Sequence, residues 1–162
     1  AMLKILATIQ QSAIDPKRLV FEVTETALVS NFEVALRSLQ LLRNLGAAIA
    51  LDDFGTGYSS LSYVHQLPLD KIKIDRRFVT DVCHDARAQK VVKTIIGLSR
   101  DLNIKCVAEG VETREQADML TASGCDLMQG YHFAMPMPLA DIITHCARPK
   151  ALAVHNETLL AG

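Results

Sequence analysis

Two adjacent aspartates stand where an apolar run gives way to glycines, in residues 51–60 (LDDFGTGYSS). Carboxylates as close as Asp52 and Asp53 repel each other, which raises the pKa of one of them unless a cation lies between them. The GxG that follows is weak evidence for a dinucleotide fold, because a third glycine is missing and the acids would repel a phosphate. Both difficulties disappear if the acids hold a divalent metal ion that in turn binds the phosphate. For the pair taken alone, a helix cap beside a solvated acid is the structural alternative.

More carboxylates stand near the ends of other apolar runs. They are Glu22 and Glu25 in FEVTE, and Glu109 and Glu112 in VAEGVE. With the aspartate pair they make six carboxylates, whose mutual repulsion at one mouth would cost several kcal/mol without a metal. Taken singly, Glu25 or Glu112 could favour a helix N-terminus, but repetition at equivalent strand ends points to a metal site. Hard oxygen ligands and the lack of a histidine cluster favour Mg2+ or Mn2+ over zinc.

Lys73 is the only strand-end cation that the sequence places among these acids. Beside metal ions it would orient an attacking water and help to deprotonate it, whereas in a metal-free site it could form a Schiff base with a carbonyl substrate, as in an aldolase. The surrounding acids favour the first interpretation, because they keep the amine protonated and poorly nucleophilic.

Short apolar runs rich in Val, Ile and Phe alternate with helical patterns along the chain. Strands are predicted over residues 19–25, 48–54, 71–75, 104–110 and 125–130. Helices are predicted over residues 3–13, 32–45, 59–66, 86–102, 113–124 and 138–147, the second opened by a Ser30 and Glu33 capping box and the fifth by Thr113 with Gln116. Strand followed by helix, five times over, indicates a parallel sheet covered by helices, either an open doubly wound sheet or a (β/α)8 barrel.

The polar residues of the predicted strands favour the barrel. Four of the five strands have one uniformly apolar face, and all five carry a polar group near the C-terminal end of the other face. A barrel places functional side chains at the C-terminal end of every successive strand, as this pattern does, whereas an open sheet binds its ligands at a single switch point. A full barrel has eight units in roughly 250 residues, and this chain has 162. We therefore expect an α/β fold, a partial TIM-like barrel of about five units over residues 1–147 that lacks its three N-terminal strands, with a tail at 148–162.

The overall composition excludes several classes of protein. With 17 Lys and Arg against 18 Asp and Glu, the net charge of −1 argues against binding a DNA or RNA duplex through its phosphates. No apolar run is long enough to span a bilayer and no secretory signal begins the chain, so this segment is expected to make no membrane contact. The four cysteines lack zinc-ligand spacing and are interpreted as reduced thiols, so a cytoplasmic protein is expected.

Five motifs, in this order and spacing, resemble those of the EAL-domain cyclic di-GMP phosphodiesterases. They are FEVTE (21–25), DDFGTGYSS (52–60), KIKID (71–75), AEGVET (108–113) and QGY (129–131). The resemblance implies a bacterial TIM-like barrel that hydrolyses cyclic di-GMP to linear pGpG with Mg2+ or Mn2+. It further implies that Glu22 and Asp52 bind metal, that Asp53 and Glu109 serve a second metal and the catalytic water, and that Lys73 positions that water.

The same resemblance gives supporting roles to other residues of these motifs. Glu25 would hold the loop at residues 52–60 in shape. Glu112, Gln129 and Asp75 would support the site or the substrate.

The sequence also departs from the family pattern, since the Glu-Ala-Leu signature and the strand with the family's asparagine ligand are absent. We therefore expect this chain alone to have an incomplete metal site and little or no activity. The exposed edge of the first strand, residues 19–25, is expected to pair with a second copy or to swap. A non-catalytic module that binds cyclic di-GMP or another protein is the alternative function.

Overall fold

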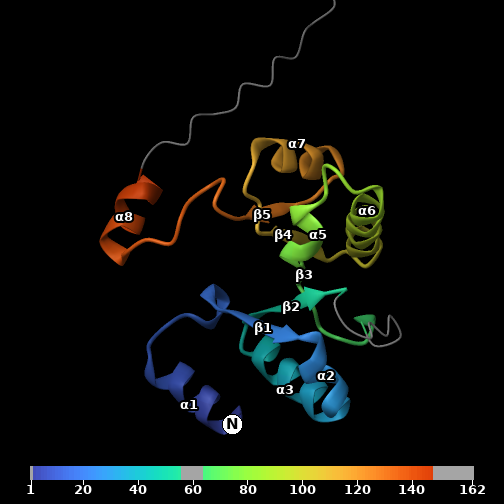
Figure 1. Cartoon of the computed structure of the whole chain (residues 1–162). Coiled ribbons are helices and arrows are strands. Elements are labelled where there is room, and N and C mark those ends of the chain that lie inside the picture. The colour runs from blue at the N-terminus through green and yellow to red at the C-terminus, as the bar shows by residue number, and fades with distance from the viewer. Residues whose placement is uncertain (1, 56–63, 148–162) are drawn as a thin grey trace, which may run out of the picture.

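A parallel sheet forms the framework of the chain in the computed structural model, which describes residues 2–55 and 64–147 apart from the side chains of residues 29 and 30 (Figure 1). Its strands are β1 (Val20–Thr24), β2 (Ala48–Phe54), β3 (Lys71–Ile74), β4 (Lys105–Glu109) and β5 (Leu127–Gln129). Each strand pairs in parallel with the next one along the chain, in the order β1-β2-β3-β4-β5. A barrel has this sequential order, whereas a doubly wound sheet reverses at a switch point. The predicted partial barrel is confirmed for the described residues.

Helices α3, α6 and α7 lie around one side of the curved sheet (Figure 1). The helices are α1 (Met2–Gln11), α2 (Glu25–Ser30), α3 (Phe32–Asn44), α5 (Arg76–Thr80), α6 (Ala86–Asp101), α7 (Arg114–Ala122) and α8 (Leu139–Ala147), with a 3-10 turn η1 (Pro16–Arg18). The helix predicted over 59–66 falls largely on residues 56–63, outside the described part. Of the helices in the described ranges, none is both long and apolar enough to cross a membrane.

Helix boundaries agree with the sequence pattern, with one correction. The capping box predicted for α7 is present, since the Thr113 hydroxyl accepts from Gln116 N–H and the Gln116 side chain accepts from Thr113 N–H. The predicted cap at Ser30 is wrong, because Asn31 caps α3 by accepting from Val34 N–H at 3.3 Å. Ser30 is instead the last residue of α2, a helix that was not predicted.

The main core lies between the sheet and these helices. Strand residues Ile49, Leu51, Ile72 and Ile74 are at most 1% exposed. They belong to one apolar cluster with helix residues that include Leu42 of α3, Val92 and Ile95 of α6, and Leu120 of α7. Each fully buried side chain of this size contributes roughly 1.5–3 kcal/mol to folding. The apolar strand face read from the sequence is therefore the helix-covered face.

The other face of the sheet forms a hollow of about 270 Å³ that residues of all five strands line. Four polar side chains line it together with apolar residues of the same strands: Glu22, Lys71, Lys73 and Gln129. At its two sides lie the edge strands, and their inward residues Val20 and Leu127 are 43% and 41% exposed. Within the described ranges, β1 pairs only with β2, and β5 only with β4. The hollow is therefore an open version of a barrel interior.

Gly130, directly after β5, makes a close approach that only glycine permits. A Cβ atom there would overlap the backbone nitrogen and carbonyl oxygen of Val111. Gly130→Ala is expected to lower the free energy of unfolding by about 3 kcal/mol, because the backbone would have to move. The matched control is Gly97→Ala in α6, where nothing lies within 4 Å of the new Cβ; it should stabilise the chain by about 0.5–1 kcal/mol through helix propensity. Urea denaturation measures both, and equal effects of the two substitutions would contradict the prediction.

Candidate active site

The ammonium group of Lys73 is the centre of the site. Its Nζ lies 2.8 Å from Glu22 Oε2, 3.1 Å from Asp52 Oδ1 and 2.8 Å from Glu109 Oε1. These four residues come from four neighbouring strands, β1 to β4, near the C-terminal ends. Lys73 is only 8% exposed, so it is held in the floor of the hollow. The sequence predicted these four side chains for one site, and the structure brings them together.

Three carboxylates around one amine determine its protonation. Burial alone would lower the pKa of Lys73, but hydrogen bonds to Glu109, Glu22 and Asp52 outweigh it and raise that pKa well above the ordinary lysine value. The amine is therefore a cation at neutral pH. A protonated amine is a poor nucleophile, which argues against the Schiff-base interpretation of Lys73.

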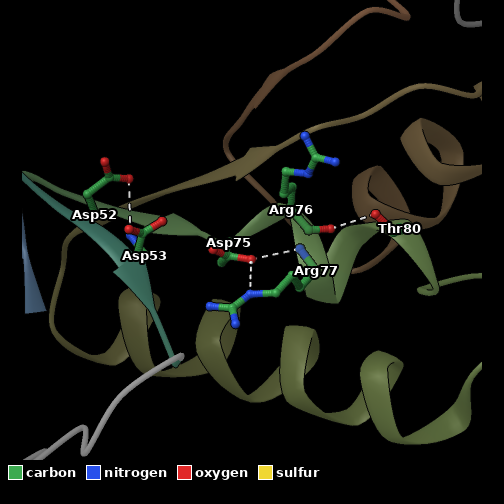
Figure 2. A network of polar contacts seen from close by, with 6 residues as sticks. All are labelled: Asp52, Asp53, Asp75, Arg76, Arg77 and Thr80. Carbon is green, nitrogen blue, oxygen red and sulfur yellow. Dashed lines mark hydrogen bonds and ion pairs between the residues drawn. The ribbon is translucent and has the colours of Figure 1, made fainter.

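A bulge in β2 presents both aspartates at this point. The register shifts between Leu51 and Phe54, so that Asp52 and Asp53 stand opposite the single residue Lys73. Asp53 takes a left-handed φ of 54°, a conformation that Asp adopts more readily than most residues. Its N–H donates to Asp52 Oδ1 at 3.0 Å (Figure 2). The two side chains consequently point in different directions, with only Asp52 on Lys73.

Asp53 faces Asp75 (Figure 2). The ion pairs of Lys73 are with Glu22, Asp52 and Glu109. Burial, followed by the negative charge of Asp52 and by the hydrogen bond with Asp75, raises the pKa of Asp53. Burial would also raise the pKa of Asp75, but hydrogen bonds from Arg77 outweigh it and hold that pKa below its usual range. Asp75 Oδ1 accepts from Arg77 N–H at 2.7 Å and from Arg77 Nε at 3.0 Å, which caps α5. Asp75 is thus a buried side chain that fixes the connection between β3 and α5.

The remaining predicted acids do not reach Lys73. Glu25 begins α2 directly after β1 and is buried at 8% exposure. Glu112 is exposed and lines a second hollow of about 210 Å³ with Glu109 and Gln129. Of the six carboxylates that the sequence predicts for one mouth, Glu22, Asp52 and Glu109 contact Lys73. The other acids do not contact Lys73, because the strand register and the bulge in β2 direct neighbouring carboxylates to different sides of the strands.

Two arginines that follow β3 were missed from the sequence. Arg77 holds Asp75, and Arg76 lines the second hollow beside Glu109. Lys73 is therefore not the only cation at the strand ends. The string Asp75-Arg76-Arg77 could have predicted a helix that begins here and carries both arginines, because Asp is a good N-cap residue.

The acids suit a hard divalent cation, although the lysine now stands among them. In residues 2–55 and 64–147, no group of three acidic, histidine or cysteine side chains is arranged as a ready metal cage. The donor set nevertheless fits, because Glu22, Asp52 and Glu109 each place one oxygen within 3.1 Å of the same nitrogen. Carboxylate oxygens that converge on one cation can exchange it for Mg2+ or Mn2+, provided that Lys73 moves aside.

Comparison with known proteins agrees with this geometry. The EAL domain family model matches residues 1–136. The cyclic di-GMP phosphodiesterase NbdA of Pseudomonas aeruginosa is 44% identical over 132 residues, which are 82% of this chain and 17% of NbdA. The solved PaMucR phosphodiesterase in complex with c-di-GMP has a TM-score of 0.79 at 41% identity, over 85% of this chain and 56% of that chain.

A further solved structure, Klebsiella pneumoniae BlrP1 with manganese and cy-diGMP, has a TM-score of 0.75 at 36% identity. The match covers 82% of this chain and 34% of that chain. The chain thus spans only part of each protein that it resembles. The match over residues 1–136, together with strand-end acids that converge on Lys73, shows that the chain belongs to the EAL-domain family.

Proposed function

We propose that this chain carries one side of the active site of a cyclic di-GMP phosphodiesterase, which hydrolyses one phosphodiester bond to give linear pGpG. The observation that supports the proposal is the convergence of Glu22, Asp52 and Glu109 on Lys73. They lie near the C-terminal ends of parallel strands, where (β/α) barrels hold their catalytic groups. NbdA and MucR, which this chain resembles, are named as phosphodiesterases with this substrate or ligand.

The acids and the relatives also support a requirement for divalent metal ions. BlrP1 was solved with calcium and with manganese in complex with cy-diGMP. In this chain Glu22 and Asp52 would hold one Mg2+ or Mn2+, while Asp53 and Glu109 would hold a second. Because Asp53 faces Asp75, its carboxylate would have to turn for this. Bound ions would polarise the phosphate and lower the pKa of a water.

The side chains themselves supply positioning and proton transfer. Lys73 stays protonated, so its N–H groups donate to the attacking water or to a phosphate oxygen. Glu109, 2.8 Å from Lys73 Nζ, is placed to accept the proton of that water. Arg76 brings a positive charge to the adjoining hollow, which suits the second phosphate of a dinucleotide. Glu112 and Gln129 line the same hollow and would contact the substrate.

The purified chain is expected to bind cyclic di-GMP only when Mn2+ is present, and to convert it to pGpG at least about 100-fold more slowly than the PaMucR phosphodiesterase. The open hollow admits water and lacks the support that a closed barrel gives to its metal ligands, a loss worth roughly 10–100-fold for each supporting contact. Calorimetry measures binding, and chromatography of the nucleotide products measures turnover.

The controls for this experiment are the chelator EDTA and linear pGpG as ligand. Binding that is unaffected by EDTA would contradict the metal site. Turnover as fast as that of PaMucR would contradict the expectation of a weak fragment. Metal-dependent binding without any product would support the alternative, a module that binds cyclic di-GMP without hydrolysing it.

We also propose that the chain associates with itself through the open edge of β1. Val20 on this strand is 43% exposed, and unpaired strand edges recruit further strands. Light scattering is expected to show twice the monomer mass, and Val20→Lys should return the chain to a monomer by placing a charge at the edge. Val34→Lys, at a similarly exposed valine on α3, is the matched control and should leave the dimer intact. A monomeric wild-type chain would contradict the proposal.

A further inference from the structure

Two cysteines lie against each other at the opposite end of β4 and β5 from the acids. Cys106 is in β4 and completely buried, while Cys125 stands two residues before β5 and is half-buried. The Cys125 thiol donates to the carbonyl oxygen of Cys106 at 3.7 Å and to that of Leu127 at 3.2 Å, and the Cys106 and Cys125 side chains influence each other's ionisation. Neither residue has a part in the proposed hydrolysis.

The backbone places this pair in a geometry that a disulfide can bridge. Val107, directly after Cys106, pairs with Leu127, two residues after Cys125. Paired strands are about 4.8 Å apart, so neighbouring register positions fall in the roughly 4.4–6.8 Å between Cα atoms that a disulfide spans. The Asp126 carboxylate, which accepts from Cys106 N–H at 2.8 Å, fixes the approach of the two segments.

The two thiols differ in reactivity. The hydrogen bond with Cys125, and then burial, raise the pKa of the Cys106 thiol. The hydrogen bond from Cys106 lowers the pKa of the Cys125 thiol; burial opposes this, and backbone hydrogen bonds of Leu127 and Ala108 add to the lowering. Cys125 is thus the more readily ionised and the more accessible of the two sulfurs, and Cys106 is the buried thiol beside it. Redox-sensitive cysteine pairs have this arrangement.

We propose that Cys125 and Cys106 form a hydroperoxide-sensitive thiol pair that closes reversibly to a disulfide. The Cys125 thiolate attacks one oxygen of a hydroperoxide and breaks the O–O bond, which leaves a sulfenic acid on Cys125 and releases water or an alcohol. The Cys106 sulfur then attacks the Cys125 sulfur, the S–O bond breaks and a water leaves. In sum two thiols lose their hydrogens and two electrons to one hydroperoxide, and an external thiol reverses the reaction.

The disulfide would join two strands that carry candidate site residues. Glu109 ends β4 three residues after Cys106, and Gln129 ends β5 four residues after Cys125. Glu109 and Gln129 already pair in the ladder, and a covalent bond before the start of β5 would limit how far the two strands can separate. Oxidation therefore constrains the hollow that Glu109 and Gln129 line.

The test is to treat the intact chain with hydrogen peroxide, alkylate the remaining thiols under denaturing conditions, and map the digest by mass spectrometry. A peptide pair linked through Cys106 and Cys125 is expected, lighter by two hydrogen atoms and split by reductant. Both cysteines should lose alkylation together, in equal amounts. Cys83, whose pKa is raised by burial, should stay reduced; exposed Cys146 reports non-specific oxidation and should form no internal link.

Variants separate the two steps. In Cys106→Ser the sulfenic acid on Cys125 should persist and be captured by dimedone, whereas Cys125→Ser should leave Cys106 reduced. Cys146→Ser is the matched control and should keep the link. The proposal is overturned if the native chain oxidises at Cys146 while Cys106 and Cys125 both remain alkylated. It is also overturned if Cys106 oxidises equally in Cys125→Ser. If a variant fails to fold, the mass-spectrometric map of the wild-type chain still shows whether the link between Cys106 and Cys125 forms.

Discussion

Lys73→Met is expected to lower the free energy of unfolding by about 2–3 kcal/mol in metal-free buffer. The substitution keeps the length of the side chain but removes the cation that Glu22, Asp52 and Glu109 share. Breaking a buried ion pair costs about 3–5 kcal/mol. The lower figure applies here because the Glu22 side chain is 50% exposed and solvent screens part of the repulsion.

The pH of the measurement follows from the direction of the pKa shift. The pKa of Lys73 is raised in the folded chain, so its stabilisation is fully present below the ordinary lysine pKa of about 10.4. It is lost only as the pH rises through the higher folded value. Thermal unfolding at neutral pH in EDTA therefore captures the whole effect, a fall of roughly 5–10 °C for a domain of this size.

Lys71→Met is the matched control for this variant. Lys71 lies two residues earlier in the same strand and lines the same hollow, but it makes no salt bridge among the described residues. Its loss should change the unfolding temperature by less than half as much. Equal effects of the two substitutions would show that Lys73 stabilises the chain through its side-chain length or burial, rather than through the charge that it shares with the three carboxylates.

Manganese is expected to act more strongly on Lys73→Met than on the wild type. In the wild type the ion must displace the ammonium from the three carboxylates, whereas in the variant they stand ready for it. Mn2+ should therefore restore part of the lost stability without restoring turnover, since the N–H groups that would position the water are gone. A variant that Mn2+ does not stabilise would contradict the assignment of these acids as metal ligands.

Much of this arrangement could be predicted from the sequence, because it depends on local pattern. Ile72 and Ile74 alternate with Lys71 and Lys73, and a period of two on a helix-covered sheet leaves the lysines only the hollow to face. The alternation of strand and helix patterns likewise predicted parallel strands, and the polar groups near the strand ends favoured a barrel, which has the observed sequential strand order. The Thr113 capping box was equally local, since all its partners lie within four residues.

The parts that could not be predicted depend on contacts between elements. The left-handed φ of Asp53 arises in a bulge, and nothing in the string Asp52-Asp53 says which carboxylate turns away from Lys73. The start of α3 could not be chosen between Ser30 and Asn31, because both are good caps and the choice depends on where α2 ends. Short α2 and α5 give too few residues for a periodic signal.

Asp52→Asn and Glu109→Gln are each expected to remove the stabilisation of the chain by Mn2+. At a free Mn2+ concentration one hundred times its dissociation constant, binding to the folded state alone contributes about 2.7 kcal/mol. Losing a ligand carboxylate should weaken the affinity by at least about 100-fold. At the same Mn2+ concentration the stabilisation then falls to about 0.4 kcal/mol.

The same variants in EDTA show whether they fold. Each leaves two carboxylates on Lys73, so the cost in metal-free buffer should be only about 1 kcal/mol, the usual net worth of one hydrogen bond. Glu115→Gln is the matched control, because Glu115 is an exposed acid in the first turn of α7, away from Lys73. It should retain the full effect of Mn2+.

Asp53→Asn completes the series because the structure sets Asp53 apart from the other acids. Its carboxyl group is hydrogen-bonded to Asp75 and is also repelled by the charge of Asp75. An asparagine amide can donate to Asp75 without that charge, so this variant should be no less stable than the wild type in EDTA. If Asp53 turns to hold a second ion, the variant should still bind one Mn2+ but lose turnover. If instead Asp53→Asn leaves the number of bound ions and the turnover unchanged, Asp53 is not a metal ligand. Its role is then to contact Asp75, and other residues hold the second ion.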